Sequence, residues 1–574
     1  MDVLILLVLA VLARIPFLAQ AGNLLDLDEA SFALMAKRIL MGEIPLYLTS
    51  QSYLGSLVSF VMAPWVALLG CTALPVKLTT LTFSLGFIAV NYLLLKTIAR
   101  RSVAIFASLF LILMPPGLMD LSTRVTGAHP ELWVFQAVLL LLLFKFFEGP
   151  TRIPMERLLL GMGVLTGMAL WICEVFLLYL IPFLIYFVLR FWKPREESVI
   201  QSICNFFRLS YFRLPTWLRI LLQTWHGLIL LFLVFHGVGI FLPHFGAVVP
   251  FQIKVLKKLF LVFSGELVLI YWFHTPASDR LSLLRNLGFL VGGFLLGHAP
   301  AIVFNLAGGE GLRIFHGSGA IGLTEIPNRL QLIFMRRIPE LILGNPVFWE
   351  MILVSFGVLG FAFRKNRASY IWLFYGLGFF ILLGNLVSTL EAARYLSHLY
   401  VPFTVLLGYF LGGFLWPKRR LIAILLALFV LLHFGHGYYR YYRAIPKDHA
   451  SNQAKILEFL RSEKIHGGYA SRTISSILTY LSKERLIFSS YGIAERYIPY
   501  EQYTKSLSRP AYIFETDDSS AESFRKDENL FSQVESQKIF GPYIVYLLRN
   551  SSSISDLPYA PPPRRFPIYL YLNE

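Results

Sequence analysis

Long apolar stretches recur along this chain up to about residue 440, separated by short polar or basic segments. A helix crosses the hydrocarbon core of a bilayer with about 20 apolar residues. Backbone polar groups must be bonded internally there, so such stretches fold as helices. Charged residues make up only 15% of the chain, against roughly 25% in a soluble protein. The sequence therefore predicts a polytopic α-helical membrane protein.

The hydropathy pattern predicts about 13 spans. They lie at 3–20, 73–95, 102–118, 131–147, 157–173, 175–191, 219–242, 255–273, 286–306, 347–363, 369–387, 397–415 and 420–438. The first is taken as an uncleaved helix, because no small-x-small cleavage site precedes the polar residues that follow. Residues 53–70 are also apolar, but a span there would reverse the sidedness of every later loop, so we expect a helix at the outer surface.

Lys and Arg outnumber Asp and Glu by 51 to 34, a net charge of +17. The basic residues are scattered among apolar spans, which indicates cytoplasmic loops and anionic membrane lipids rather than nucleic acid. They cluster at 96–101, 145–157, 190–219, 280–285, 364–367 and 418–420. With these clusters inside, the polar segment after the first span, the later loops at 119–130, 307–346 and 388–396, and everything after 438 lie outside. In this orientation Lys254, Lys257 and Lys258 would lie on the outer side, where basic clusters are not expected.

The three cysteines lie far apart and predict neither a disulfide framework nor a thiolate metal site. After residue 440 the chain becomes polar, with a short helix predicted at 453–463 and strands at 485–489, 511–514 and 543–548. We therefore expect two domains. Residues 1–440 form the membrane domain, with a first outer loop at about 21–72 containing interfacial helices, and residues 441–574 form a soluble α/β domain.

Three carboxylates, Asp26, Asp28 and Glu29, follow the first span directly. Acids at a helix start are stabilised by its dipole, so they could simply cap the next helix. Other outer loops carry matching polar groups, which favours chemistry instead. One loop has Arg124 and His129 before Glu131 at the mouth of a span, and another has Arg394 and Tyr395.

Outer-side carboxylates and an outer-side Arg suit glycosyl transfer from a lipid phosphate. A carboxylate must take the proton of an acceptor hydroxyl. Positive charge or a metal must stabilise the departing phosphate. An apolar groove between helices must hold the lipid tail.

Several short segments, taken in order, resemble the GT-C superfamily of integral-membrane glycosyltransferases, closest to the group of aminoarabinose transferases and protein O-mannosyltransferases. The resemblance covers nearly the whole chain. Its segments begin at Arg14, Leu25, Gly42, Gln51, Gly127, Gly167, Phe304 and Arg394, and continue at Ile465, Tyr480 and Arg496. The chain departs from the family pattern at His129, where an aromatic residue is common, and at Ser397-His398, where Leu-Pro is common.

The resemblance implies a GT-C fold, a polyprenyl-phosphate-linked sugar donor, and a glycan, lipid or protein acceptor reached from the periplasmic face of a bacterial inner membrane. It also implies that Asp28 is the catalytic base, Glu131 a second acidic position and Arg394 the phosphate-side Arg. Metal dependence varies in the superfamily, so a divalent ion on Asp26 and Asp28 stays open.

We therefore expect an inverting glycosyltransferase in which Asp28 and Glu29 act with Glu131. Substrate or phosphate contacts are expected from Arg394, Tyr395, Arg124, Lys37, Tyr53 and His129. The alternatives are a ligase or polymerase that uses a lipid pyrophosphate, a transporter or flippase, and a non-catalytic scaffold. A transporter would need ionisable residues deep within spans, and Glu174 and Glu266 are the only acids that look deep.

Overall fold

The computed structural model describes residues 1–49, 51–147, 153–177, 179–184, 275–307, 393–492 and 495–549, together with a few isolated positions. Seven helices in this part are long and apolar enough to cross a membrane. They are Asp2–Ala19, Ala73–Ile98, Pro130–Phe147, Met155–Ile172, Ala277–Leu306, Leu396–Leu415 and Arg420–Ser462. The prediction of a polytopic helical membrane protein is confirmed. The predicted spans at 219–242, 255–273, 347–363 and 369–387 lie outside the described residues, apart from isolated positions.

The polar segment after the first span folds into short elements between two long helices. Helix α1 (Asp2–Ala19) is followed by η1 (Ala21–Leu24) and α2 (Leu27–Leu40). A small antiparallel hairpin then pairs β1 (Tyr47–Leu48) with β2 (Gln51–Gly55). Helix α3 (Leu57–Leu69) leads to the long α4 (Ala73–Ile98). At 1.5 Å per residue, the 13 residues of α3 reach about 20 Å, too short for a hydrocarbon core of about 30 Å. This length agrees with the surface helix expected at 53–70.

The span predicted at 102–118 is not one continuous helix. Helix α5 (Arg101–Ile112) ends early, and α6 (Pro116–Leu121) begins after a short break. Pro115 and Pro116 lack the N–H groups that would continue the hydrogen-bond ladder, so the helix is interrupted before them. The hydropathy pattern extends across this break because Leu113 and Met114 are apolar.

Helices α7 (Pro130–Phe147) and α8 (Met155–Ile172) follow, and α8 packs closely beside α13 (Arg280–Leu306). Four glycines make this contact possible. A Cβ on Gly163 or Gly167 would lie 2.1 or 2.3 Å from a backbone oxygen of α13, and one on Gly293 or Gly297 would lie 2.3 or 2.1 Å from a backbone oxygen of α8. Small residues four apart allow such close approach of membrane helices.

Two of the basic clusters, at 96–101 and 418–420, lie at the same end of the helix bundle. Arg101 pairs with Asp2 at 2.6 Å, and Ser102 donates a hydrogen bond to the carbonyl of Gly412, near the basic residues at 418–420. At the opposite end, α2 meets the start of α4. The 26 residues of α4 extend about 39 Å between these ends. The acids Asp26, Asp28 and Glu29 therefore lie at the opposite end of the bundle from the basic clusters at 96–101 and 418–420.

The carboxyl-terminal part contains a five-stranded mixed sheet in the order β4-β3-β5-β7-β6. Strands β3, β4 and β5 run parallel, and β7 is antiparallel to β5 and β6. The strands span Gly467–Ala470, Ile487–Ser490, Ala511–Glu515, Val534–Phe540 and Tyr543–Leu548 for β3 to β7. The three strands expected from the sequence are confirmed as β4, β5 and β7. Residues 550–574 lie outside the described part, and the domain boundary at 440/441 stays a prediction.

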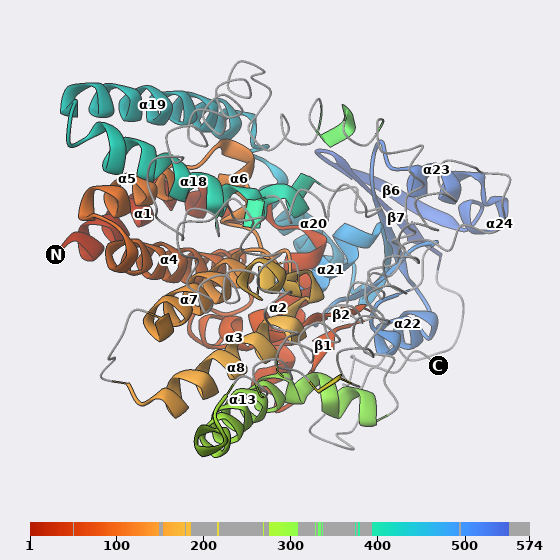
Figure 1. Ribbon diagram of the computed structural model, residues 1–574. Helices are drawn as coiled ribbons and strands as arrows, with labels where there is room; N and C mark the ends of the chain where they lie inside the picture. The colour runs from red at the N-terminus through yellow and green to blue at the C-terminus, as the bar shows by residue number, and fades with distance from the viewer. Residues whose placement is uncertain are drawn as a thin grey trace, which may run out of the picture.

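Helices precede and flank this sheet. They are η6 (Ala393–Leu399), α18 (Tyr400–Tyr409), η7 (Phe410–Leu415), α19 (Arg420–Ala444), α20 (His449–Ser462), α21 (Arg472–Leu481), α22 (Ile498–Lys505), α23 (Ser519–Lys526) and α24 (Glu528–Phe531). Figure 1 shows the long helices on one side of the molecule and the sheet on the other, with α20 and α21 between them.

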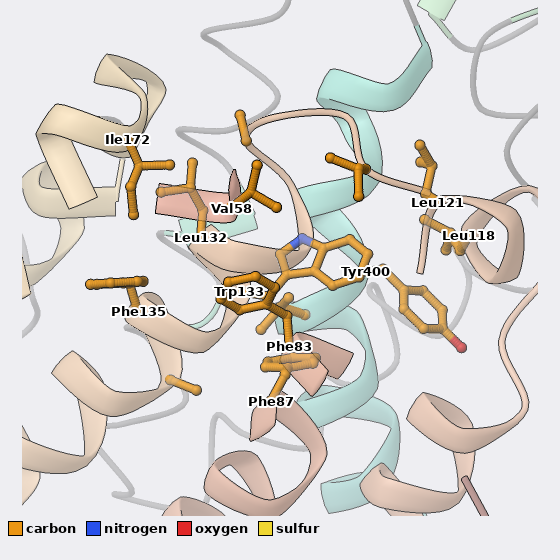
Figure 2. Close-up of a cluster of buried hydrophobic side chains, with 14 of the residues drawn as sticks. Val58, Phe83, Phe87, Leu118, Leu121, Leu132, Trp133, Phe135, Ile172 and Tyr400 are labelled. Carbon is orange, nitrogen blue, oxygen red and sulfur yellow. The ribbon is translucent and has the colours of Figure 1, made fainter. Parts of the chain in front are cut away.

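An aromatic core holds the bundle together beneath the acidic segment. Trp133 of α7 lies among Phe83 and Phe87 of α4 and Tyr400 of α18, with Leu118 and Leu121 of α6 nearby (Figure 2). Trp133 is 2% exposed and its ring centroid is 5.8 Å from that of Phe87. This packing fixes the start of α7, and so the position of Glu131.

Candidate active site

Helix α2 begins with a capping box. The Oδ1 atom of Asp26 accepts a hydrogen bond from the backbone N–H of Glu29 at 2.9 Å, and Oε2 of Glu29 accepts one from the N–H of Asp26 at 3.2 Å. Two N–H groups that the helix cannot pair internally are thereby satisfied. Capping, the alternative weighed for this segment, is confirmed for Asp26 and Glu29.

The Glu29 side chain is fully buried against a lysine. Nζ of Lys77, in the first turns of α4, lies 2.6 and 2.7 Å from the two carboxylate oxygens. The backbone N–H of Val125 donates a further bond at 3.1 Å. Burial raises the pKa of the Glu29 carboxyl to about 7, and the Lys77 ammonium opposes that rise. These contacts tie α2 to α4 and to the loop before α7, which favours a structural function for Glu29.

Asp28 has a different environment from its two acidic neighbours. Its side chain is 22% exposed, and its Oδ1 atom lies 3.1 Å from Nη1 of Arg496 in the carboxyl-terminal part. The same Nη1 donates to Oγ of Ser31 at 3.2 Å. The predicted base therefore lies where α2 meets the carboxyl-terminal part, within reach of water.

Tyr53, a predicted site residue, and Arg472, which was not predicted, also lie near Asp28. Arg472, the first residue of α21, is close enough to interact electrostatically with Asp28, Tyr53 and Arg496. Burial, and then the charge of Arg496, lower the pKa of Arg472. The structure thus brings the predicted Asp28 and Tyr53 together with two arginines from the carboxyl-terminal part.

Arg124 and Lys37 already have carboxylate partners. Nη2 of Arg124 lies 3.3 Å from Asp26, and Nη1 lies 3.2 Å from Asp120. Nζ of Lys37 lies 2.5 Å from Glu484, which connects α2 to the turn after α21. Burial alone would raise the pKa of Glu484, but the charges of Arg38 and Lys37 lower it overall.

A second cluster of buried polar side chains joins the residues on either side of Glu131 in the sequence to His398. The Nδ1 atom of His129 lies 2.9 Å from Nε2 of His398, and the Trp133 indole donates to Nδ1 of His398 at 3.1 Å. Because Trp133 can only donate, His398 accepts at Nδ1 and carries its proton on Nε2 when neutral. Glu131 is 1% exposed, and neither carboxylate oxygen has a hydrogen-bond partner among the described residues. This cluster is distinct from the surroundings of Asp28.

Arg394 and Tyr395 belong to η6, whose later residue His398 contacts His129. Their side chains lie outside the described part, so their expected phosphate contacts stay predictions.

The metal expectation for Asp26 and Asp28 does not match the donor arrangement. Both Asp26 oxygens are engaged by Glu29 and Arg124, while Asp28 pairs with Arg496. Within the described ranges no group of three or more His, Cys, Asp and Glu side chains is placed to hold a metal.

Sequence reasoning missed Lys77, Arg472 and the contact between Arg496 and Asp28. Lys77 carried a usable signal, because a lysine within a predicted span normally has a partner. The arginines carried none, since the contact between Arg496 and Asp28 joins positions 468 residues apart.

Comparison with known proteins gives structural matches only. No protein-family model and no curated protein matches the chain. The structure is similar over 94% of the chain to ArnT from Cupriavidus metallidurans bound to undecaprenyl phosphate, with 97% of that chain covered, 12% identity and a TM-score of 0.37. It is similar over 90% of the chain to the Archaeoglobus fulgidus oligosaccharyltransferase in complex with Zn and sulfate, with 68% of that chain covered, 11% identity and a TM-score of 0.42.

Both are GT-C membrane glycosyltransferases. At these identities and TM-scores the similarity by itself assigns no activity to this chain.

Proposed function

We propose that this protein is an inverting glycosyltransferase that moves a sugar from a polyprenyl-phosphate carrier to an acceptor hydroxyl at the outer face of the membrane. The observation that carries the proposal is the environment of Asp28. Its neighbours Asp26 and Glu29 hold α2 in place, whereas Asp28 is partly exposed and faces Arg496, with Arg472 and Tyr53 close by. A carboxylate beside cations suits a base acting next to a phosphate leaving group.

The reaction follows from these charges. Asp28 accepts the proton of the acceptor hydroxyl while that oxygen forms a bond to the anomeric carbon. The bond from the anomeric carbon to the phosphate oxygen breaks on the opposite face, which inverts the configuration. The electron pair stays with the polyprenyl phosphate, which leaves as an anion and needs compensating positive charge. The donor class is the one that the sequence resemblance implies.

The remaining predicted residues enter this proposal with narrower functions. Arg394, at the same end of the bundle as His398, is proposed to approach the donor phosphate, with Tyr395 beside it. Glu131 and His129 are proposed to line the acceptor or donor pocket beneath the outer surface. Lys37 and Arg124, which already pair with carboxylates, contribute by positioning α2. The acceptor, whether glycan, lipid or protein, is open.

The decisive experiment replaces Asp28 by Asn in the full-length protein. Without the carboxylate, no group takes the acceptor proton, and we expect transfer to fall by at least about 100-fold. Transfer is measured with the purified protein, an undecaprenyl-phosphate sugar and an acceptor extract from the cell envelope. Asp517→Asn, an exposed site far from α2 in the sequence, is the matched control. Transfer by Asp28→Asn at the rate of this control would refute Asp28 as the base.

The choice of donor distinguishes the proposed transferase from the rival, a ligase or polymerase that uses a lipid pyrophosphate. The proposal expects turnover with a monophosphate carrier and none with the pyrophosphate carrier of the same sugar. The reverse preference would favour the rival. Movement of an unmodified labelled lipid across vesicles would favour a flippase.

A further inference from the structure

Arg496 holds more hydrogen-bonding capacity than its contacts use. Its side chain is only 9% exposed, and its Nη1 contacts Asp28 and Ser31. The Nε atom is buried and has no partner among the described residues. A guanidinium carries five N–H donors, and burying one without an acceptor is unfavourable.

Arg472 repeats this situation beside Arg496. Its Nε atom is also buried without a partner in the described part of the chain. It is the first residue of the ten-residue α21, where the helix dipole adds partial positive charge. Two guanidinium groups and a helix start therefore lie close enough to interact electrostatically.

Glu495, the carboxylate next to Arg496 in the chain, accepts hydrogen bonds from backbone N–H groups instead. Oε1 of Glu495 accepts the backbone N–H groups of Arg496 and Tyr497, at 2.8 and 3.3 Å. Its Oε2 accepts the N–H of Ser490 at 2.7 Å. The unused guanidinium donors of Arg472 and Arg496 thus lack an anion with several acceptor oxygens, and a phosphate has that chemistry.

We propose that Arg472 and Arg496, supplied by the carboxyl-terminal part, bind the phosphate of the polyprenyl carrier beside Asp28. This inference rests on the proposed function and names the residues that receive the leaving group. Asp28 competes with the phosphate for Arg496. When Asp28 takes the acceptor proton it loses its charge, and Arg496 is released to the phosphate as that group gains negative charge. The two charge changes offset each other.

Binding of undecaprenyl phosphate to the full-length protein in nanodiscs tests this proposal without requiring turnover. We expect Arg472→Ala and Arg496→Ala each to weaken binding about tenfold, the usual effect of losing a charged hydrogen bond. Arg496→Lys keeps the positive charge but loses the paired N–H donors of the guanidinium. Its affinity for undecaprenyl phosphate should lie between those of the wild type and Arg496→Ala. Arg485→Ala, an exposed arginine of the same domain, is the matched control. Undecaprenol, which lacks the phosphate, should bind equally to all variants.

The competition predicts an unusual result for Asp28→Asn. This variant frees Arg496, so undecaprenyl phosphate should bind several-fold more tightly even though transfer is lost. Competition by inorganic phosphate distinguishes a site for the lipid headgroup from a general anion site. At a general anion site, millimolar inorganic phosphate should displace undecaprenyl phosphate readily. At the proposed headgroup site, it should displace little of the lipid.

Two results would overturn the assignment. One is wild-type binding of undecaprenyl phosphate by both Arg→Ala variants. The other is an equal loss in Glu484→Gln, which weakens the contact between α2 and the soluble part but leaves both arginines. Activity of Asp28→Asn would refute Asp28 as the base but would leave the binding measurements on Arg472 and Arg496 unaffected. The proposed function and this inference can therefore be refuted independently.

Discussion

At the scale of single residues, three adjacent acids have three different environments. Asp26 caps α2, Glu29 is buried against Lys77, and Asp28 faces the carboxyl-terminal part. The sequence could predict that the segment matters, because acids beside a span are costly. The family resemblance singled out Asp28, but the residue types alone could not separate the three environments, because these depend on a lysine 48 positions away and an arginine 468 positions away.

The buried pair of Glu29 and Lys77 gives a stability prediction. Lys77→Met leaves the Glu29 carboxylate in a fully buried site without its cation. We expect the free energy of unfolding to fall by about 3–5 kcal/mol. Glu29→Gln combined with Lys77→Met removes both charges and should recover much of that loss. Thermal unfolding in detergent measures both variants. Equal stability of the single and double variants would contradict a coupled ion pair.

The two departures from the family pattern are in direct contact. His129 and His398 come from distant segments, yet their rings are joined by a 2.9 Å hydrogen bond. The sequence identified both residues, but only the fold shows that they form one unit.

At the scale of elements, hydropathy predicted the long helices well and their interruptions poorly. The strands at β4, β5 and β7 follow from alternating apolar runs, and α7 starts at Pro130 as its position in a first turn suggests. The break before α6 was missed, because average hydropathy does not weigh a pair of prolines.

The contact between α8 and α13 predicts a sharp difference between two glycines of one helix. A Cβ at Gly297 would lie 2.1 Å from the carbonyl oxygen of Val164, whereas a Cβ at Gly292 meets nothing within 4 Å. We expect Gly297→Ala to destabilise the protein by at least about 1–3 kcal/mol. Gly292→Ala should be neutral or slightly stabilising, because Ala favours the helix. The melting temperatures of the two variants compare them directly, and similar values would argue against close packing here.

At the scale of the whole molecule, the acids near the start of α4 and the basic clusters at 96–101 and 418–420 lie at opposite ends of the bundle, which supports a proposed orientation. Lys and Arg accumulate on the cytoplasmic side of membrane proteins. The end that carries Arg101 and 418–420 is therefore proposed to lie inside, and the sheet outside.

Labelling of single cysteines checks this orientation. In a background with Cys71, Cys173 and Cys204 replaced by Ala, Glu458→Cys in α20 should react with an impermeant maleimide on spheroplasts. Arg419→Cys should react only after permeabilisation. Both positions are exposed, so burial does not limit either reaction. The opposite pattern would place Asp28 in the cell interior and end the periplasmic proposal.

The pairing of residue 28 with residue 496 also has a consequence for biogenesis. A ribosome must complete almost all of the polypeptide before both partners exist, although the first helices are already inserted by then. A nascent or prematurely terminated product would reside in the bilayer without an assembled centre. On the proposed function, fragments that end before residue 472 would lack Arg472 and Arg496, and we expect them to transfer no sugar.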